Sequence, residues 1–507
     1  MIQKYPVGIQ DFGEIRTNGY LYVDKTAFVY KLINEGKFYF LSRPRRFGKS
    51  LFISTLECLF LAKKELFKGL YIEDKWNWEQ TNPIIRMSFS NIGHKEKGLN
   101  KAISDELDSI ANKYDIQLSE EIISGKFKEL IQKLSATRGK VVVLIDEYDK
   151  PIIDYLGENP DKAIENRDIM KVFYSILKDA DPHLKLVFIT GVSKFSRVSI
   201  FSDLNNLQDL TTNKFFAGCC GITQNELEAH FKQELLETDK EAIKKWYNGY
   251  SWDAKTSVYN PFSLLSFFVQ GSEFKNYWFE TGTPTFLIKL AEKTQLYDFS
   301  EIEIGANALV AYDIQKLELI PLMFQTGYLT IKSYSPMSDV YVLGYPNNEV
   351  KKSYIEVLMA AYSQSDLGYG VVYVDKIRQL LEKGEIERLE GILNTIFKSL
   401  PYELWQKENE HFYHAIIHLT FSLLGVYIQS EVQTSDGRMD ALIRLKDFVY
   451  SIEFKLDESA EKAIQQIKDK GYLVPFSAEN KKLVAIGINF SREKKKVEEV
   501  KWEEIKA

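Results

Sequence analysis

Cysteine is scarce in this sequence. Its 507 residues include three cysteines, Cys58, Cys219 and Cys220, and the last two are adjacent. Small secreted domains are held together by several well-spaced cysteine pairs, and this chain has no such set. We therefore expect a protein without disulfide bonds that works in a reducing compartment, the cytoplasm.

Long apolar segments are also missing. The first residues, MIQKYPVGIQDFGEIR, contain no apolar stretch of the kind found in signal peptides. The longest apolar runs, such as VVVLI at 141–145, have the length of a strand, whereas a membrane span requires about 20 residues. The sequence therefore predicts neither a secretion signal nor a membrane segment.

The chain has no excess of positive charge. It contains 65 Lys and Arg against 71 Asp and Glu, for a net charge of −6 and a pI near 5.8. Proteins that coat nucleic acids are basic, so this class is excluded, and any binding of DNA or RNA must use local, salt-sensitive patches. The charged segment SREKKKVEEVKWEEIK (491–506) is expected to form a solvated helix.

The first two hundred residues alternate short apolar strands with amphipathic helices. Strands are expected at 37–42, 84–90, 140–146 and 184–191, and helices at 50–61, within 97–136 and at 166–180. Apolar strands separated by helices are typical of a parallel sheet covered on both faces. We therefore expect a doubly wound α/β domain over residues 1–220.

Two further domains are expected. Residues 221–400 are mainly helical, except that 319–347 resemble a winged-helix unit, which binds DNA in some proteins and serves as a packing module in others. Residues 401–507 contain a helix at 409–425. Strand candidates follow in VYIQSEVQT, RMDALIRL and FVYSIEFKL, then a helix at 458–470 and a strand at 481–490. This predicts a compact α-β-β-β-α-β domain.

The segment RPRRFGKS (43–50) has most of a phosphate-binding loop between a strand and a helix. In the general pattern G-x-x-x-x-G-K-[ST], backbone N–H groups surround a phosphate, lysine neutralises its charge and the hydroxyl binds Mg²⁺. Here Arg43 stands in place of the first glycine. The expected nucleotide-binding residues are Arg45, Arg46, Phe47, Gly48, Lys49, Ser50 and Leu51, with Arg43 adding positive charge near the phosphates.

A second motif supports this interpretation. The apolar strand KVVVLID ends in Asp146 and Glu147, which we expect to hold Mg²⁺ through water and to polarise the attacking water, respectively. The next strand ends at Thr190, with Ser193 and Arg197 just beyond, where a polar group could contact the nucleotide. Each of these residues also has a simpler explanation. Asp146 and Glu147 could merely end a buried strand, Thr190 could cap the end of its strand, and Arg197 could be exposed to solvent.

These pieces together resemble a known family. The segments YLYVDKT, LSRPRRFGKSL, LIDEYDKPI, GVSKFSRVSIFSDLNNLQDLT and WYNGYSWD are similar to those of the AAA-ATPase-like proteins of bacteria, a divergent group of P-loop ATPases. In that family RPRRFGKS is the usual form of the loop. The resemblance covers about residues 3–220 and implies ATP as the ligand. Composition alone does not separate ATP from GTP.

The hairpin GRMDALIRLKDFVYSIEFK carries Asp440, Glu453 and Lys455. Glu453 and Lys455 lie two apart on one strand and so share a face, and Asp440 lies on the strand before it. Two carboxylates that bind Mg²⁺ beside a lysine suit phosphodiester hydrolysis. A polar face at the edge of a sheet is the alternative, although a charged pair within an apolar strand is costly without partners.

Residues 408–490 resemble the core of the PD-(D/E)XK nuclease superfamily. The resemblance implies a further metal-facing carboxylate at Glu410, with Glu408 and Glu431 as alternatives. It also implies that Gln466 and Tyr472 line the site; Met439 replaces the proline that usually precedes the aspartate. His411, His414 and His418 share a helix face, but without cysteines or a second ligand pair we expect packing rather than zinc.

Three functions fit these motifs. The first is an ATPase that gates or powers a Mg²⁺-dependent nuclease acting on DNA more than RNA, in defence or the handling of mobile elements. The second is an ATP-switched protein whose nuclease-like domain only binds nucleic acid. The third is a signalling ATPase with a protein-binding tail. An arginine finger from another copy, or Arg197 acting in trans, would require a homo-oligomer.

Overall fold

The computed structural model describes most of the chain. Described are residues 3–194, 200–201, 204–278, 285–294, 296, 299–310, 318–363, 369–398, 410–427, 433–435 and 438–505. Some side chains within these ranges, among them those of Glu410 and Asp440, are not described. The chain forms two compact units, the first made of residues 1–287 and 300–349, the second of residues 288–299 and 350–507.

The first unit is built on a parallel five-stranded sheet. Its strands are β1 (Phe38–Ser42), β2 (Ile84–Ser88), β3 (Val141–Asp146), β4 (Leu184–Gly191) and β5 (Gln208–Asp209), in the order β2-β3-β4-β1-β5. Every residue of β1 and β3 is buried. This confirms the expected strands, whose apolar runs reflect helices on both faces.

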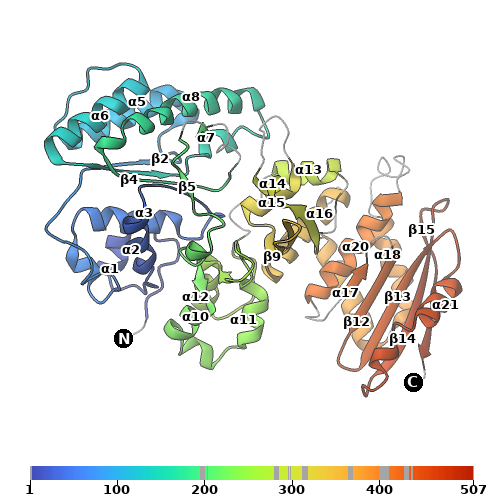
Figure 1. The fold of residues 1–507 in the computed structure, drawn as a ribbon. Helices are drawn as coiled ribbons and strands as arrows, with labels where there is room; N and C mark the ends of the chain where they lie inside the picture. The colour runs from blue at the N-terminus through green and yellow to red at the C-terminus, as the bar shows by residue number, and fades with distance from the viewer. Residues whose placement is uncertain are drawn as a thin grey trace. The chain divides into compact units, whose positions relative to one another are not determined.

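Helices cover both faces of this sheet (Figure 1). One layer contains α5 (Leu99–Lys113), α6 (Ile123–Arg138) and α8 (Pro160–Asp179), and the other contains α1 (Phe12–Thr17), α2 (Thr26–Glu35) and α3 (Lys49–Phe60). Two features favour the start of helix α8. The Asn159 side chain caps it by accepting a hydrogen bond from the Lys162 N–H, and Pro160 occupies the first turn, where no N–H is needed. The expected doubly wound α/β architecture is confirmed.

The helices after the sheet pack around an aromatic core. They are α10 (Gln224–His230), α11 (Lys240–Tyr247) and α12 (Pro261–Val269). Phe231, Trp246 and Phe267 are buried between them, and Tyr5 from the N-terminal segment stacks on Phe231 with ring centroids 5.7 Å apart. This aromatic burial joins the start of the chain to the helical region.

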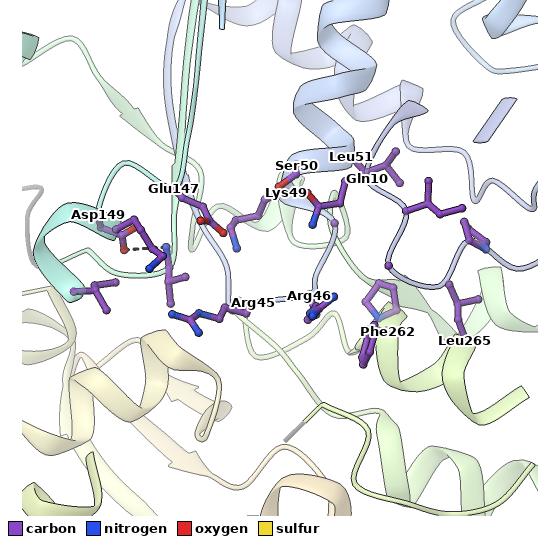
Figure 2. Close-up of a pocket in the computed structure, with 18 residues that line it drawn as sticks. Gln10, Arg45, Arg46, Lys49, Ser50, Leu51, Glu147, Asp149, Phe262 and Leu265 are labelled. Atoms are coloured by element: carbon purple, nitrogen blue, oxygen red, sulfur yellow. Dashed lines mark hydrogen bonds between the residues drawn. The ribbon is translucent and has the colours of Figure 1, made fainter. Parts of the chain in front are cut away.

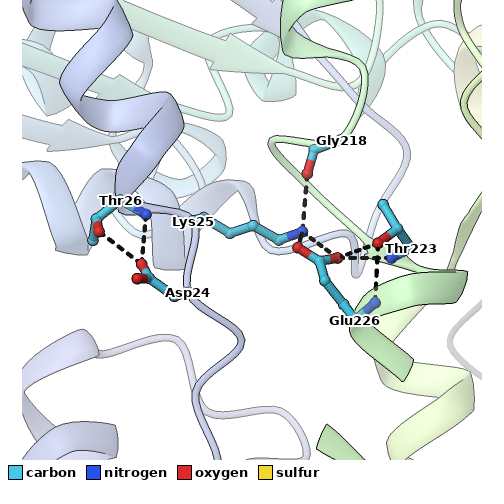
Figure 3. A network of polar contacts seen from close by, with 6 residues as sticks. All are labelled: Asp24, Lys25, Thr26, Gly218, Thr223 and Glu226. Carbon is cyan, nitrogen blue, oxygen red and sulfur yellow. Dashed lines mark hydrogen bonds and ion pairs between the residues drawn. The ribbon is translucent and has the colours of Figure 1, made fainter. Parts of the chain in front are cut away.

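A polar network makes a second link between these parts (Figure 3). The Lys25 ammonium donates hydrogen bonds to the Gly218 carbonyl at 2.9 Å and to both carboxylate oxygens of Glu226 at 2.6 and 2.7 Å. Glu226 and Thr223 form a capping box that starts α10. Lys25 is buried, and Glu226 is the carboxylate that pairs with its ammonium group.

We expect Lys25→Met to lower the free energy of unfolding by about 2–4 kcal/mol, because it leaves the largely buried carboxylate of Glu226 without its cation. Lys31→Met is a matched control: Lys31 is paired with Glu35 on the exposed surface of α2, and its loss should change stability by about 0.5 kcal/mol or less. Urea denaturation of both variants measures the difference. Equal midpoints would contradict a structural role for the Lys25 pair.

A helix and a small sheet complete the first unit. Helix α15 (Leu319–Thr326) ends at Gly327, and strands β9 (Thr330–Ser335) and β10 (Val340–Gly344) follow, as the winged-helix-like pattern predicts. Strand β8 (Ile302–Gly305) adds a third strand that the sequence did not predict, in the order β8-β10-β9. Short helix α14 (Ala306–Val310) follows β8.

The second unit is a mixed sheet with helices on it (Figure 1). The order is β11-β12-β13-β14-β15, with β13 and β14 parallel and the other pairs antiparallel. The strands are β11 (Gln433–Ser435), β12 (Arg438–Arg444), β13 (Phe448–Leu456), β14 (Lys482–Ser491) and β15 (Lys496–Ile505); the helices are α17 (Tyr369–Lys383), α18 (Leu389–Lys398), α20 (Glu410–Tyr427) and α21 (Ala460–Lys470). Helices α13 (Thr285–Thr294) and α16 (Asn348–Ser363) each span a boundary between the two units.

Two predictions for this unit need correction. Strand β15 occupies the segment 491–506 that we expected to be helical. Val497 and Val500 fit a helical turn, but Val497 is buried and the Lys and Glu residues suit an edge strand, which charged side chains protect from pairing with other chains. Helix α20 also runs to Tyr427, into the expected strand 426–434, of which residues 428–432 are not described.

The division into domains at 220 and 400 stays a prediction. Within the second unit α17 contacts α20 and α18 contacts β15, so these two helices of the expected middle region pack with the C-terminal sheet. Among the described helices, none combines the length and hydropathy needed to cross a membrane.

Candidate nucleotide and nuclease sites

The phosphate-binding loop connects the end of β1 to the start of α3. Gly48 adopts a left-handed conformation, with φ of 93°, and Lys49 begins the helix directly after it. This conformation explains the glycine, because a side chain would be strained there. The loop therefore presents the free N–H groups of the α3 N-terminus, which favour an anion.

A cavity of about 400 Å³ lies beside this loop (Figure 2). Predicted site residues that line it are Arg45, Arg46, Gly48, Lys49, Ser50, Leu51 and Glu147. Figure 2 shows Lys49 and Glu147 on one side and the apolar residues Phe262 and Leu265 on another. The cavity thus combines a charged wall with an apolar one.

Lys49 is buried at the polar wall. Its ammonium donates hydrogen bonds to the carbonyls of Arg43 and Pro44, at 2.9 and 3.0 Å. Burial lowers the pKa of Lys49, while the carboxylates of Asp146 and Glu147 act in the opposite direction. Because Lys49 and Glu147 line the same cavity, the two predicted motifs lie beside each other.

Asp146 and Thr190 lie at the ends of adjacent parallel strands, β3 and β4. The Thr190 hydroxyl donates a hydrogen bond to Asp146 Oδ1 at 2.7 Å, and both residues are buried. Since β4 lies between β3 and β1, the carboxyl ends of the three strands place this pair next to the loop. Ligands of open α/β sheets bind at this edge.

Backbone conformation at two cavity residues is unusual. Arg46 and Glu147 have φ of 68° and 52°, in the left-handed region that non-glycine residues seldom adopt. Strained residues cluster at functional sites in many proteins, but seven other described non-glycine residues of this chain, all outside the cavity, also have positive φ. Both residues line the cavity, and Glu147 follows the metal-site candidate Asp146 directly.

Sequence reasoning missed Asp149. Its Oδ2 accepts hydrogen bonds from the Val192 and Ser193 N–H groups at 3.0 and 2.6 Å and from the Ser193 hydroxyl at 2.6 Å. Burial raises the pKa of Asp149. This carboxylate holds the end of β4 against the segment after β3; the second aspartate in DEYDK is the signal that could have identified it.

The expectation that Arg43 adds positive charge near the phosphates is wrong. Its side chain is fully buried and donates hydrogen bonds to the carbonyls of Ser42, Thr211 and Phe216, at 2.9, 2.8 and 3.3 Å. The guanidinium lies 4.0 Å from the centroid of the Trp252 ring. Arg43 therefore anchors the loop from behind instead of facing the cavity.

Phe47 also points away from the charged wall. Its ring packs edge-on against Tyr250 and Trp252, with centroids 4.7 and 5.4 Å apart. Of the predicted nucleotide contacts, Phe47 can therefore contribute only its backbone at that wall. Tyr250 and Trp252 belong to the segment WYNGYSWD, whose aromatic residues thus form a support for the loop.

The winged-helix-like segment contributes to the same support. A Cβ at Gly327 would lie 2.8 Å from the ring of Pro44, and the Trp278 indole N–H donates to the Arg45 carbonyl at 3.3 Å. The close approach and the positive φ of Gly327 both require glycine. Gly327 of this segment, and Trp278 outside it, therefore pack against the loop, while the choice between DNA binding and packing for residues 319–347 stays a prediction.

We expect Arg43→Lys to destabilise the first unit by at least about 2 kcal/mol, because lysine cannot make the planar contact with Trp252 and satisfy three carbonyls at once. Arg138→Lys is the control: Arg138 lies 5.4 Å from the Tyr114 ring centroid but is exposed. Thermal unfolding measures both. Equal melting temperatures for the variants would contradict an anchoring role for Arg43.

The second candidate site lies on β13. Glu453 and Lys455 share the face of the sheet covered by α21, and the Lys455 ammonium lies 3.2 Å from Glu453 Oε1 and 2.6 Å from Gln466 Oε1. The register places Asp440 of β12 directly opposite Glu453. Lys455 thus contacts both Glu453 and Gln466, while the expected convergence of Asp440 with Glu453 and Lys455 stays a prediction, because the Asp440 side chain is not described.

The Glu453 carboxylate is buried and only partly satisfied by the described residues. Its residue is 1% exposed, and Oε2 has no hydrogen-bond partner among the described residues. A buried carboxylate oxygen without a partner is costly unless a cation or a donor satisfies it. The arrangement fits a hard divalent cation such as Mg²⁺, which prefers carboxylate oxygens.

Several other predicted residues cannot be placed. The side chains of Glu410, His411, His414 and Asp440 are not described, and Arg197, Glu408 and Glu431 lie outside the described residues altogether. Within the described part of the chain there is no group of three or more metal-ligating side chains. Tyr472 packs against the apolar cluster between α21 and the sheet.

Comparisons with known proteins identify the two regions that carry these candidate sites. Residues 6–201 match the family described as Predicted AAA-ATPase, and residues 408–500 match the PD-(D/E)XK nuclease superfamily. A protein of Azotobacter chroococcum mcd 1, described as "Uncharacterized protein in vnfD 5'region", is 39% identical over 98% of each chain. No solved structure matches significantly.

The phosphate-binding loop and Glu147 fall within the first family match, and Glu453, Lys455 and Gln466 fall within the second, whereas the apolar wall of the cavity, with Phe262 and Leu265, lies beyond the first match. The full-length similarity shows that the relative shares this combination of regions. The chain belongs to the AAA-ATPase-like family and carries a C-terminal domain of the PD-(D/E)XK nuclease superfamily.

Proposed function

We propose that this protein binds and hydrolyses ATP in its first unit and thereby controls a Mg²⁺-dependent nuclease in its second unit that cuts DNA. The observation that carries the proposal is the presence, in one chain, of two assembled sites. One is the cavity with Lys49 and Glu147, and the other is the contact of Lys455 with Glu453. Defence or the handling of mobile elements are suitable settings.

In the ATP site, the N–H groups at the start of α3 and the Lys49 ammonium bind the β- and γ-phosphates. Arg45 and Arg46, both exposed at the cavity, add positive charge. Ser50 and Asp146 would hold Mg²⁺, which supplies charge neutralisation of the phosphates when bound. Thr190 fixes the Asp146 carboxylate by its hydrogen bond.

Glu147 acts as the base that orients and polarises the attacking water. We expect Glu147→Gln to retain ATP binding within about threefold and to lower hydrolysis by about a hundredfold or more, because general-base catalysis contributes on that order. Glu158→Gln, at an exposed position before α8, is the control. Calorimetry measures binding and phosphate release measures hydrolysis; undiminished hydrolysis would exclude this role.

In the nuclease site, Glu453 and Asp440 would hold Mg²⁺, with Glu410 as a further ligand, and the metal supplies Lewis-acid stabilisation of the phosphate charge. The Lys455 ammonium positions and polarises the attacking water. Gln466 keeps Lys455 in place through its 2.6 Å hydrogen bond. Incubation with plasmid, linear DNA and RNA in Mg²⁺ tests this half, and no cleavage of any substrate would refute it.

A second candidate is an ATP-switched protein that binds nucleic acid or a protein partner without cutting. Of these two kinds of partner, charge favours the protein: residues 401–507 contain 16 Lys and Arg and 18 Asp and Glu, so this domain has no basic excess. Nucleic-acid binding depends on positive surface charge. Binding of DNA without cleavage in the same assay would favour this candidate.

A further inference from the structure

Cys219 and Cys220 form a close pair of thiols that neither proposed site uses. Both residues are buried, at 2% and 3% exposure, and the two thiols interact, since each shifts the pKa of the other. Both line an apolar cavity of about 90 Å³, together with Tyr22, Leu51 and Phe231. The third cysteine, Cys58, lies on α3 and does not line this cavity.

The thiol cavity adjoins the nucleotide cavity. Pro6, Gly48, Leu51, Pro261 and Leu265 line both. The backbone also connects them, because the N–H of the residue after Cys220, Gly221, donates a hydrogen bond to the Phe47 carbonyl in the loop at 3.1 Å. A group attached to the thiols would therefore lie against the phosphate-binding loop and the start of α3.

The surroundings of the pair favour a thiolate on Cys219. Its pKa is lowered by the interaction with Cys220 and by the positive charges of Arg43 and Lys25, whereas the same interaction raises the pKa of Cys220. Lys25 is held beside the pair by its bond to the carbonyl of Gly218 (Figure 3). A thiolate, rather than a thiol, is the reactive form.

Geometry decides which chemistry suits two such sulfurs. Consecutive Cα atoms are about 3.8 Å apart, whereas disulfides usually join Cα atoms about 4.4–6.8 Å apart, so a direct disulfide would be strained. A zinc site needs about four ligands, and no third metal-ligating side chain joins the pair in the described part of the chain. A single thiophilic atom that bridges both sulfurs avoids both problems.

We infer that Cys219 and Cys220 form a binding site for trivalent arsenic compounds that carry one organic group, and that occupation of this site excludes nucleotide from the adjoining cavity. With an arsine oxide, two As–S bonds form, and the two thiol protons leave with the arsenic-bound oxygen as one molecule of water. Arsenic stays trivalent, so no oxidant or reductant is needed. The exclusion of nucleotide rests on the proposed ATP site.

The first test is intact mass spectrometry of the folded, full-length protein after exposure to phenylarsine oxide. We expect one phenylarsenic group per chain, removed by 2,3-dimercaptopropanol. It should be lost in Cys219→Ser and Cys220→Ser and kept in Cys58→Ser. Cys219→Ala and Cys220→Ala, with circular dichroism of each variant, separate loss of the site from loss of the fold. An unmodified native protein, or an adduct that disappears only in Cys58→Ser, would overturn the inference.

The second test is competition. Saturating Mg²⁺–ATP should slow adduct formation at least tenfold, and the adduct should weaken ATP binding in calorimetry by at least tenfold. Equal labelling rates with and without bound ATP would overturn the exclusion of nucleotide. If calorimetry detects no ATP binding to the unmodified protein, the proposed function fails and the exclusion with it, whereas the adduct itself is judged by mass alone.

Discussion

Lys49→Ala should lower ATP hydrolysis by at least about a hundredfold and weaken ATP binding, while the protein remains folded. Lys49 is the buried cation at the polar wall of the cavity, beside Asp146 and Glu147. Without it, those carboxylates would face the phosphates without compensation, and removal of one preorganised group at a transition state costs roughly a hundredfold or more. Phosphate release under saturating ATP measures the change.

Lys133→Ala is the control for this variant. Lys133 is exposed on α6, where it pairs with Glu129 and does not line the cavity, so its loss should leave hydrolysis within about twofold. Circular dichroism of both variants checks the fold. Hydrolysis by Lys49→Ala at the wild-type rate would mean that the cavity beside the loop is not the site of ATP turnover.

Lys455→Ala and Glu453→Gln should each lower DNA cleavage by about a hundredfold or more. Lys455→Ala removes the ammonium group that polarises the attacking water, and Glu453→Gln replaces a charged metal ligand by a neutral amide. The two variants should differ in stability. Glu453→Gln removes a buried carboxylate with an unpartnered oxygen but keeps a side-chain oxygen that can accept a hydrogen bond from Lys455, so we expect it to melt at the same or a higher temperature than the wild type.

Lys462→Ala is the matched control for the nuclease variants. Lys462 lies on α21 like Gln466, but it forms an exposed pair with Glu458. Its loss should leave cleavage within about twofold. Cleavage that persists in both Lys455→Ala and Glu453→Gln would show that the activity belongs to another site or to a contaminant.

Most of the sheet strands were predictable because burial on both faces imposes continuous apolar runs. VVVLID and LKLVFITG form strands β3 and β4 with almost the expected bounds. Strand β15 was not predictable from the local sequence, because the spacing of Val497 and Val500 is compatible with a helix. Only the pairing of this segment with β14 makes it a strand. Local pattern is weakest where long-range pairing determines the structure.

In the candidate sites, too, the residues placed by local sequence were predictable, and those placed by long-range contacts were not. Lys49, Asp146 and Glu453 follow from the backbone path of a loop or strand, which the sequence pattern indicates. The role of Arg43 depends on Thr211, Phe216 and Trp252, which are distant in sequence, so no local motif could reveal that it faces away from the phosphates. Asp149 was missed because its partners lie after a different strand.

The measurement that tests the central claim most directly is the rate of plasmid cleavage in Mg²⁺, with and without ATP, by the wild type, Lys49→Ala and Lys455→Ala. If ATP turnover controls the nuclease, the wild type responds to ATP, Lys49→Ala cuts at one rate with or without ATP, and Lys455→Ala does not cut although it still hydrolyses ATP. If Lys49→Ala responds to ATP as the wild type does, the control of a nuclease by this ATP site is contradicted.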